Sequence, residues 1–353
     1  MTIPILICDD SSFARKQMAR ALPPNWDVSI SYAENGEQAI AAIKQGLGDI
    51  LFLDLNMPVL DGYGTLEAIQ AQDLPTLTIV VSGDIQPEAH QRVNALGALD
   101  FIQKPTDKNK VLQILTDYGV IRPEDMLQSQ LLADSASELA QTVAQDMQRL
   151  DADNDIRIDA YQEVANVAMG RAGDLLARIL DVNVRLPIPK VNVLASSELH
   201  MILKATDEES AISAVCQGFI GSGISGEALI LFYDSTVNEF AQLMNYQGEV
   251  DDAIEREMLI DLSNILVGAF LKGFSDQLDL GFSQSHPELL GLHRNVAQLI
   301  NSDNRKWQEI LAIEINYSIE KYNIDCDLIV LITQQSLPIL NNKLIYLLDE
   351  KLA

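Results

Sequence analysis

Five residues in the first third of the chain share a position, because each follows or ends a short apolar run. Asp9 and Asp10 follow the first run, Asp54 the third, Ser82 the fourth and Lys104 the fifth. If the runs are parallel strands of one sheet, their carboxyl ends meet at one edge. Three carboxylates placed so close repel one another unless a cation joins them, and all-oxygen ligation suits Mg²⁺. One carboxylate could then attack a phosphoryl donor, while the metal ion, Lys104 and Ser82 stabilise the phosphoryl oxygens.

The elements that must position these residues are indicated by alternating patterns. Apolar runs occur at Ile3–Cys8, Val28–Tyr32, Ile50–Leu53, Leu77–Val81 and Ala98–Ile102. Amphipathic patterns between and after them predict helices at Ser12–Leu22, Gly36–Lys44, Gly62–Gln72, Ile85–Leu96 and Asp107–Asp117. Five strands that are each followed by a helix predict an α/β fold with a doubly wound, five-stranded parallel sheet. The nearly continuous apolar character of the strands fits burial on both faces.

Residues 1–120 closely resemble the receiver domain of bacterial response regulators. The resemblance implies that Asp54 is the phosphorylation site and that a histidine kinase supplies the phosphoryl group. It also implies that Ser82 and Phe101 are the hydroxyl and aromatic switch residues, and that Lys104 is the cation that acts with them. Phe101 lacks the hydroxyl of the tyrosine that often stands at this position.

The same resemblance implies how a metal ion is held. Mg²⁺ would be bound by Asp10, Asp54 and the main-chain carbonyl of Asn56, with Asp9 acting through a water molecule. All of these ligands are oxygen atoms, which hard divalent cations prefer.

A second set of polar residues occurs twice, 98 positions apart, in residues 156–353. Each copy has a carboxylate, a second carboxylate four residues on, an asparagine three residues further, and a proline after 22 more residues. The copies are Asp159, Glu163, Asn166 and Pro189, and Glu257, Asp261, Asn264 and Pro287. Spacings of four and three place the first three side chains on one helical face. The repetition predicts two copies of one α/β unit, related by a pseudo-twofold axis.

A carboxylate beside an amide suggests hydrolysis of a phosphoryl group. An amide donates and accepts hydrogen bonds at once, so it can orient a water molecule in line with phosphorus. The motif resembles the signature of the CheC/CheX family of chemotaxis phosphatases. The resemblance implies hydrolysis of phospho-aspartate on a CheY-like receiver, with Glu163 paired to the receiver lysine and Asn166 positioning the water.

The second copy departs from the family pattern. Asp261 stands where glutamate is usual, which shortens the reach of the carboxylate by roughly the ~1.5 Å of a carbon–carbon bond. Leu271 stands where the first copy has Gly173, whereas Asn264 is retained. The second site is therefore expected to be weaker or specialised.

Composition narrows the classes of partner. The 353 residues carry 24 Lys and Arg against 51 Asp and Glu, a formal net charge of −27. Nucleic-acid binding needs clustered basic residues, and anionic membranes attract them, so both partners are disfavoured. No apolar run approaches the ~18 residues that span a bilayer. Three scattered cysteines without a Cys-x-x-Cys pair indicate a reduced, cytoplasmic protein with any metal held by oxygen.

These patterns favour a response regulator in which a receiver at residues 1–120 and a helical linker at 121–155 precede a phosphatase domain at 156–353. Two alternatives stay open. The phosphatase can act in cis on the chain's own phosphorylated Asp54, or residues 156–353 can form a non-enzymatic module that binds chemotaxis or flagellar-switch proteins. The sequence allows a homodimer through exposed strand edges but does not decide it.

Overall fold

A computed structural model describes residues 2–24, 26–121, 154–195, 212–233, 236–244, 246, 248, 250–294, 309–319, 322 and 324–349. Two compact units are present, one comprising Met1–Glu163 with Ile345–Ala353 and the other Val164–Leu344. Their boundary falls inside one helix, α8 (Asn154–Leu180), directly after Glu163. The helical linker expected at 121–155 lies outside the described residues, apart from its ends.

The first unit contains the predicted five-stranded parallel sheet. Its strands are β1 (Ile3–Cys8), β2 (Val28–Ala33), β3 (Ile50–Leu53), β4 (Leu77–Ser82) and β5 (Asp100–Gln103). The spatial order is β2-β1-β3-β4-β5, with every pair parallel. The chain therefore reverses its winding direction at β1, and the carboxyl ends of β1 and β3 lie side by side.

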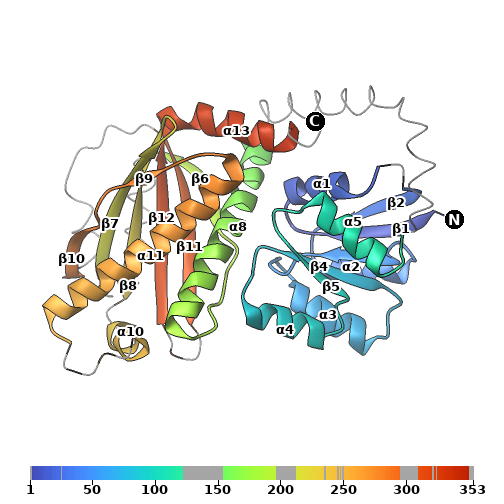
Figure 1. Cartoon of the computed structure of the whole chain (residues 1–353), viewed down its shortest axis with the longest axis horizontal. Coiled ribbons are helices and arrows are strands. Elements are labelled where there is room, and N and C mark those ends of the chain that lie inside the picture. Colours follow the sequence, from blue (N-terminus) through green and yellow to red (C-terminus); the bar gives the residue numbers. More distant parts are fainter. Residues whose placement is uncertain are drawn as a thin grey trace. The chain divides into compact units, whose positions relative to one another are not determined.

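Five helices lie on both faces of this sheet (Figure 1). They are α1 (Ser12–Ala21), α2 (Gly36–Lys44), α3 (Gly62–Ala71), α4 (Pro87–Ala95) and α5 (Lys108–Asp117). Four of them begin at a polar side chain that accepts a hydrogen bond from the first turn, and the fourth helix instead begins with Pro87. These local signals explain why the predicted helix boundaries differ from the observed ones by at most two residues.

Two apolar clusters, one on each face, hold the first unit together. Ile5 and Ile7 of β1 pack in the cluster that includes residues of α1 and α5. Leu6 and Cys8 pack in the cluster that includes residues of α2, α3 and α4. Successive residues of a strand point to opposite faces of the sheet, and both faces of β1 are buried. The residues that point to either face are therefore apolar, which accounts for the unbroken apolar run of β1 in the sequence.

The second unit contains an antiparallel sheet. Its described strands are β6 (Lys190–Ala195), β7 (Ile212–Gly221), β8 (Ile224–Tyr233), β9 (Ser283–Gln284), β10 (Glu288–Arg294), β11 (Glu309–Ile319) and β12 (Ile324–Thr333). Six of them follow the order β10-β7-β8-β12-β11-β6, and β9 pairs with β7. The runs predicted as strands at Ala228–Tyr233 and Asp327–Thr333 lie within β8 and β12.

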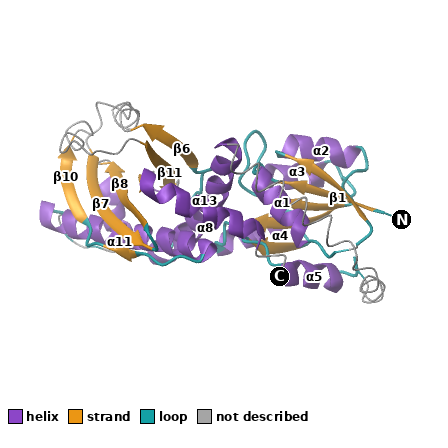
Figure 2. Ribbon diagram, turned by 90° about the horizontal axis from the view of Figure 1, so that it is seen from above, coloured by secondary structure: helices purple, strands orange, loops and turns teal. Residues whose placement is uncertain are grey.

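Two long helices, α8 and α11 (Asp252–Leu278), lie across one face of this sheet (Figure 2). They contact each other closely, because a Cβ atom at Gly273 would lie 2.9 Å from the Cα of Ala168. The side chain of Gln277 donates a hydrogen bond of 3.0 Å to the carbonyl of Val164. The shorter helices α10 (Val237–Leu243) and α13 (Leu337–Asp349) follow β8 and β12.

Helix α11 is also long and apolar enough to cross a membrane by length and composition alone. From the sequence, no apolar run long enough to span a bilayer is expected, and α11 differs from that expectation. In the structure, 61% of its most apolar stretch is buried inside the protein, as in the core helix of a globular domain.

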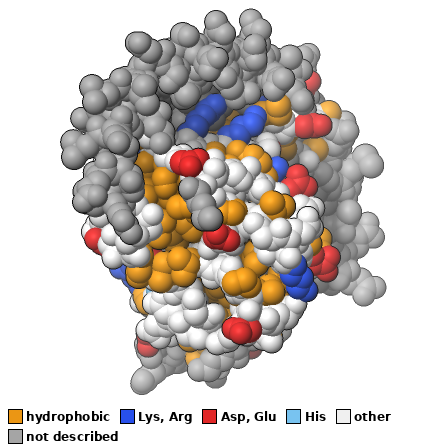
Figure 3. Space-filling view, turned by 90° about the vertical axis from the view of Figure 1, so that its right-hand side faces the viewer, with side chains coloured by type: hydrophobic (Ala, Val, Ile, Leu, Met, Phe, Trp, Pro, Cys, Tyr) orange, Lys and Arg blue, Asp and Glu red, His pale blue; other side chains and the backbone are white. Residues whose placement is uncertain are grey.

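Acidic and basic side chains are interspersed with apolar patches on the face of the molecule shown in Figure 3. Among the described residues, exposed apolar side chains in the first unit include Ile30 and Tyr32 of β2 and Tyr118 after α5.

Candidate functional site

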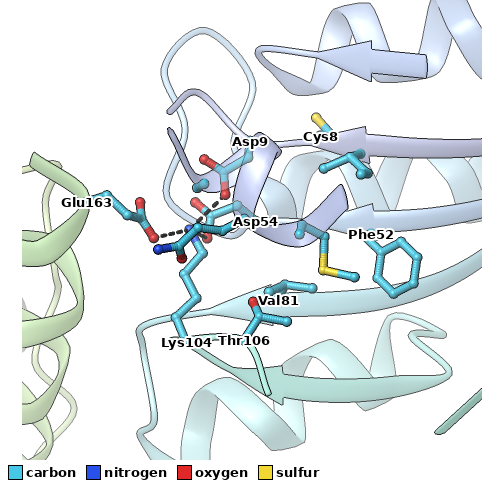
Figure 4. Close-up of a pocket in the computed structure, with 12 residues that line it drawn as sticks. Cys8, Asp9, Phe52, Asp54, Val81, Lys104, Thr106 and Glu163 are labelled. Atoms are coloured by element: carbon cyan, nitrogen blue, oxygen red, sulfur yellow. Dashed lines mark hydrogen bonds and ion pairs between the residues drawn. The ribbon is translucent and has the colours of Figure 1, made fainter. Parts of the chain in front are cut away.

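The carboxyl edge of the parallel sheet brings buried charges together, as the sequence predicts. The ammonium group of Lys104 lies 2.7 Å from Asp9 Oδ2 and 3.1 Å from Asp54 Oδ1. All three residues are at most 5% exposed. Figure 4 shows them converging from the ends of different strands. Asp10 is half-buried beside them.

Main-chain hydrogen bonds hold these residues in place. The N–H of Asp54 donates to the carbonyl of Cys8 over 2.9 Å, which ties the end of β3 to the end of β1. The N–H of Lys104 donates to the carbonyl of Ser82 over 2.9 Å, which ties the segment after β5 to β4. The peptide bond between Lys104 and Pro105 is cis. The N–H of Asn56 donates to Asp54 Oδ2 over 3.0 Å, so Asn56 lies directly beside the central carboxylate.

The acidic residues can hold a divalent cation. Asp9, Asp10 and Asp54 each offer an oxygen atom, and these atoms lie within 4.8 Å of one another. Asp54 Oδ1 is buried 3.1 Å from the Lys104 ammonium group and accepts no hydrogen bond from the described residues. Burial, together with the charge of Asp9, raises the pKa of Asp10 to about 6. Burial likewise raises the pKa of Asp54, so a bound cation would relieve unfavourable charge in this oxygen cluster.

The two predicted switch residues lie on the neighbouring strands β4 and β5. Ser82 is fully buried at the end of β4, and its hydroxyl accepts a hydrogen bond of 3.2 Å from the N–H of Asp84. Phe101 of β5 is 8% exposed. The ring of His90 in α4 packs on Phe101 with the centroids 3.8 Å apart and the planes inclined by 37°. Sequence reasoning missed His90, because only the fold brings α4 over β5.

The first copy of the carboxylate–amide motif contributes to the same pocket. Within the first compact unit, Glu163 Oε1 lies 3.0 Å from Lys104 Nζ, and Glu163 lines the pocket in Figure 4. Burial raises the pKa of Glu163 to about 7, although the charge of Lys104 opposes the shift. Asp159 Oδ2 accepts hydrogen bonds from the hydroxyl of Ser12, over 2.6 Å, and from the N–H of Phe13, over 2.9 Å.

This contact gives Asp159 a role that the sequence did not indicate. Its carboxylate binds free N–H and hydroxyl groups at the start of α1, where a negative charge is favourable. The motif spacing gave no signal for it, because the partners are about 146 positions away in the sequence.

Other residues of the first copy are packed inside the second unit. Asn166 is 7% exposed, and among the described residues its Oδ1 atom has no hydrogen-bond partner. Gly173 packs against Leu186, since a Cβ atom there would lie 2.4 Å from a methyl carbon of that leucine. The glycine therefore serves close packing. Pro189 is buried immediately before β6.

The second copy presents its motif to solvent. Glu257, Asp261 and Asn264 are all exposed on α11, and none of them lines the pocket in Figure 4. Asn264 Oδ1 accepts a hydrogen bond of 3.1 Å from Nε2 of Gln217, a buried residue of β7. Pro287 follows β9, whose residues pair with β7. Gln217 is not among the residues predicted from the sequence. A polar residue in a mostly apolar segment can indicate a buried polar contact, and this is the signal that could have identified it.

Comparisons with known proteins concern mainly the first unit. Residues 5–116 match the response regulator receiver domain family. The protein-glutamate methylesterase/protein-glutamine glutaminase of Bacillus licheniformis is 37% identical over 107 residues, which cover 30% of this chain and 30% of that protein. The chain thus spans under a third of the length of this curated relative.

Two solved structures are similar to parts of the chain. The response regulator domain of Thermotoga maritima CheB is 26% identical, covers 35% of this chain and 100% of its own, and has a TM-score of 0.31. FliY of Thermotoga maritima is 19% identical, covers 55% of this chain and 96% of its own, and has a TM-score of 0.42. With the family match, the parallel sheet and the acidic pocket in hand, residues 5–116 form a response regulator receiver domain.

Proposed function

We propose that the chain is a cytoplasmic response regulator of chemotaxis signalling whose second unit hydrolyses phospho-aspartate on receiver domains. The observation that carries the proposal is the carboxylate–amide pair repeated on two long helices, α8 and α11, over one sheet. The receiver itself implies a phosphodonor kinase, and the relatives that match it include a protein-glutamate methylesterase. The regulatory input and the hydrolytic output would then lie on one chain.

The surroundings of the two motifs support two copies of one unit related by a pseudo-twofold axis. Both helices are followed by an aspartate in the left-handed region, Asp181 with φ 53° and Asp279 with φ 48°. Residues 98 positions apart then make matching antiparallel pairs. Arg185 pairs with Ser318 as Ser283 pairs with Ile220, and Lys190 pairs with Glu314 as Glu288 pairs with Cys216.

The matching framework also explains the distance from asparagine to proline. After each asparagine the helix continues for nearly four turns and ends at Leu180 or Leu278. The chain then turns back and pairs with β11 or β7, the strand next to the edge, before the proline leads into the edge strand, β6 or β10. A change in the 22-residue spacing would shift this pairing, so the spacing is a requirement of the fold.

In the receiver, Asp54 would accept the phosphoryl group from a histidine kinase. The residues that would hold Mg²⁺ are Asp10, Asp54 and the carbonyl of Asn56, with Asp9 acting through water. The ion would neutralise charge on the phosphoryl oxygens. Lys104, whose ammonium group lies 3.1 Å from Asp54, would contact the same oxygens. Ser82 would do so from the buried end of β4, where its carbonyl accepts a hydrogen bond from the N–H of Lys104.

In the second unit, Asn166 and Asn264 would orient the attacking water. The water oxygen bonds to phosphorus, the bond from phosphorus to the aspartyl oxygen breaks, and inorganic phosphate leaves with the carboxylate restored. The amide acts by position, since it has no proton-transfer pKa in the useful range. Glu163 and Asp261 would pair with the lysine of the substrate receiver and fix its approach.

Phosphate release from a separate receiver tests this proposal. The substrate is a purified CheY-type receiver labelled with ³²P by acetyl phosphate, with the excess donor removed. We expect the wild-type chain to shorten its lifetime, and the Asn166→Ala/Asn264→Ala variant to lose the effect. Asn192→Ala, an exposed asparagine of the same unit outside the motif, serves as the matched control. Binding without hydrolysis, unaffected by Asn166→Ala, would favour the non-enzymatic module.

One observation favours hydrolysis in cis as a second candidate. The 3.0 Å ion pair between Lys104 and Glu163 joins the receiver lysine to the motif carboxylate of the same chain. If this pair serves catalysis, phosphorylated Asp54 should decay at a rate independent of protein concentration. Glu163→Gln and Asn166→Ala should each lengthen its lifetime, and an unchanged lifetime would contradict this candidate.

A further inference from the structure

We infer that Gln217 is a positioning residue that holds the amide of Asn264 in one orientation and so prepares the second motif face for hydrolysis. This inference rests on the function proposed above. Among the described residues, Asn264 is the motif residue to which Gln217 is hydrogen-bonded, and Gln217 is inferred to act through that side chain.

The hydrogen bonds of Gln217 determine which terminal atom is oxygen and which is nitrogen in the side-chain amides of Gln217 and Asn264. Its Nε2 atom lies 2.9 Å from the carbonyl oxygen of Ser285, 3.1 Å from Asn264 Oδ1 and 3.3 Å from Gln284 Oε1. A main-chain carbonyl can only accept a hydrogen bond, so the group of Gln217 facing Ser285 must be the NH₂ group. The atom of Asn264 facing that NH₂ group must then be its oxygen, because two NH₂ groups would repel each other.

The segment that provides the Ser285 carbonyl is itself fixed to β7. The N–H of Ser285 donates to the carbonyl of Gly218 over 2.8 Å, and the N–H of Gly218 donates to the Ser285 hydroxyl over 3.0 Å. Gln217 is 3% exposed, whereas Asn264 is exposed to solvent. An anchored, buried amide therefore orders a solvent-facing one that would otherwise rotate freely. Ordering before the substrate arrives is what a water-positioning group requires.

A glutamine at position 217 lowers the stability of the fold relative to an aliphatic residue. This cost supports a functional reason for a glutamine at this position. Its Oε1 atom is buried, and no described residue donates a hydrogen bond to it. An unpaired buried amide oxygen costs free energy that an aliphatic side chain would avoid. The position 98 residues later holds Ile315, which is 1% exposed. The second repeat thus has an apolar residue at the position where the first repeat has a glutamine, and that glutamine reaches Asn264, the asparagine of the second motif.

Steady-state hydrolysis in trans tests the inference. The enzyme is the full chain with Asp54→Asn and Asn166→Ala, which cannot be phosphorylated and retains only the second face. The substrate is the full chain with Asn166→Ala and Asn264→Ala, phosphorylated on Asp54 with ³²P-labelled acetyl phosphate. Adding Gln217→Met to the enzyme should lower kcat by about tenfold, with KM changed by less than about twofold. The melting temperature should stay the same or rise.

Two further variants separate positioning from a structural role. In an Asp54→Asn enzyme that keeps Asn166 and carries Asn264→Ala, so that only the first motif face remains, Gln217→Met should leave the rate unchanged. Ser213→Ala removes another buried polar contact between β7 and α11, the 3.1 Å hydrogen bond to Glu255, and should lower stability without lowering kcat. If Gln217→Met leaves kcat unchanged, or lowers it equally with and without Asn264, the inference is wrong.

A spectroscopic measurement separates failure of the inference from failure of the proposed function. The side-chain NH₂ signals of Asn264 should show restricted motion in the full chain, and Gln217→Met should make them as mobile as those of a free surface asparagine. Unchanged motion contradicts the inference alone. Absence of hydrolysis by the Asp54→Asn chain with both motif asparagines intact contradicts the proposed function, and the role of Gln217 in hydrolysis fails with it.

Discussion

Lys104 is a buried cation that lies among several carboxylates. Its ammonium group lies within about 3 Å of an oxygen atom of Asp9, Asp54 and Glu163. Burial by itself would lower the pKa of Lys104, but the charges of Asp54, Asp9 and Glu163 together raise it well above its ordinary value. The lysine therefore stays charged, and the pocket holds surplus negative charge before any phosphoryl group enters. Two predictions follow from this imbalance.

Removal of the Lys104 ammonium group should destabilise the protein. Lys104→Met leaves buried carboxylates without their partner, so we expect the free energy of unfolding to fall by about 3 kcal/mol at neutral pH without Mg²⁺. Urea denaturation of the full chain measures the loss. Adding Asp9→Asn to Lys104→Met should restore part of it, because the repulsion between carboxylates is reduced. Equal stability of Lys104→Met and wild type would contradict this account of the pocket.

The raised pKa of Glu163 should make stability depend on pH. Its folded-state pKa of about 7 lies above the ordinary value of 4.5, so the folded protein binds more protons than the unfolded chain between these values. This group therefore makes the free energy of unfolding fall as pH rises from about 4.5 to about 7. Carboxyl ¹³C titration in metal-free protein, with Glu163→Gln to assign the signal, should give a midpoint near the higher value. A midpoint near 4.5 would show that Glu163 is not buried against Lys104.

At the scale of elements, the start of α3 packs directly against the residues that follow β3. A Cβ atom at Gly62 would lie 2.3 Å from the carbonyl oxygen of Asp54, which no side chain tolerates. The N–H of Gly62 donates to the carbonyl of Leu55 over 3.0 Å. Asp61 begins the helix by accepting a hydrogen bond of 2.7 Å from Gly64. Position 62 thus has to be glycine for the strand end and the helix to meet.

Gly62→Ala should therefore displace Asp54. We expect a loss of about 1–3 kcal/mol in the free energy of unfolding, together with slower phosphorylation of Asp54 by acetyl phosphate. Gly268→Ala is the matched control for stability. That helical glycine has only the side chain of Gln284 within 4 Å, at 3.8 Å, and alanine there should stabilise α11. Equal effects of the two substitutions would contradict the packing argument.

The elements also show what sequence reasoning can and cannot recover. The strands of the first unit are mostly apolar runs, and residues that start helices follow them, so local signals suffice to locate both. The acidic pocket follows from the parallel order of the strands. Strands β7 and β11 carry polar residues such as Gln217 and Glu314, and their periodicity was too mixed to identify them. The contacts of Asp159 with Ser12 and of Gln217 with Asn264 depend on packing between distant segments, which no local pattern encodes.

At the scale of the whole molecule, charge distinguishes the two modes of hydrolysis. The formal net charge is −27 at pH 7. When one copy of the chain is the substrate of another, the partners repel each other, and salt screens this repulsion. Hydrolysis in trans between copies should therefore gain in kcat/KM, by a few fold, between about 20 and 200 mM salt.

Hydrolysis in cis should not respond in this way, because the reacting groups belong to one chain. Parallel measurements with the trans pair described above and with the singly phosphorylated wild-type chain separate the two. A trans rate that falls with added salt would show that local attraction, rather than net charge, controls the encounter.

The packing of His90 against Phe101 offers a way to follow the state of the receiver by magnetic resonance, without an optical probe. An aromatic ring shifts the magnetic resonance of protons held over its face, and the His90 ring lies 3.8 Å from that of Phe101. The chain has only four histidines, so the carbon-bound imidazole protons give few and separable signals. Movement of the switch residue on phosphorylation of Asp54 would change the ring-current shift of one histidine, and a one-dimensional proton spectrum would follow it without any label.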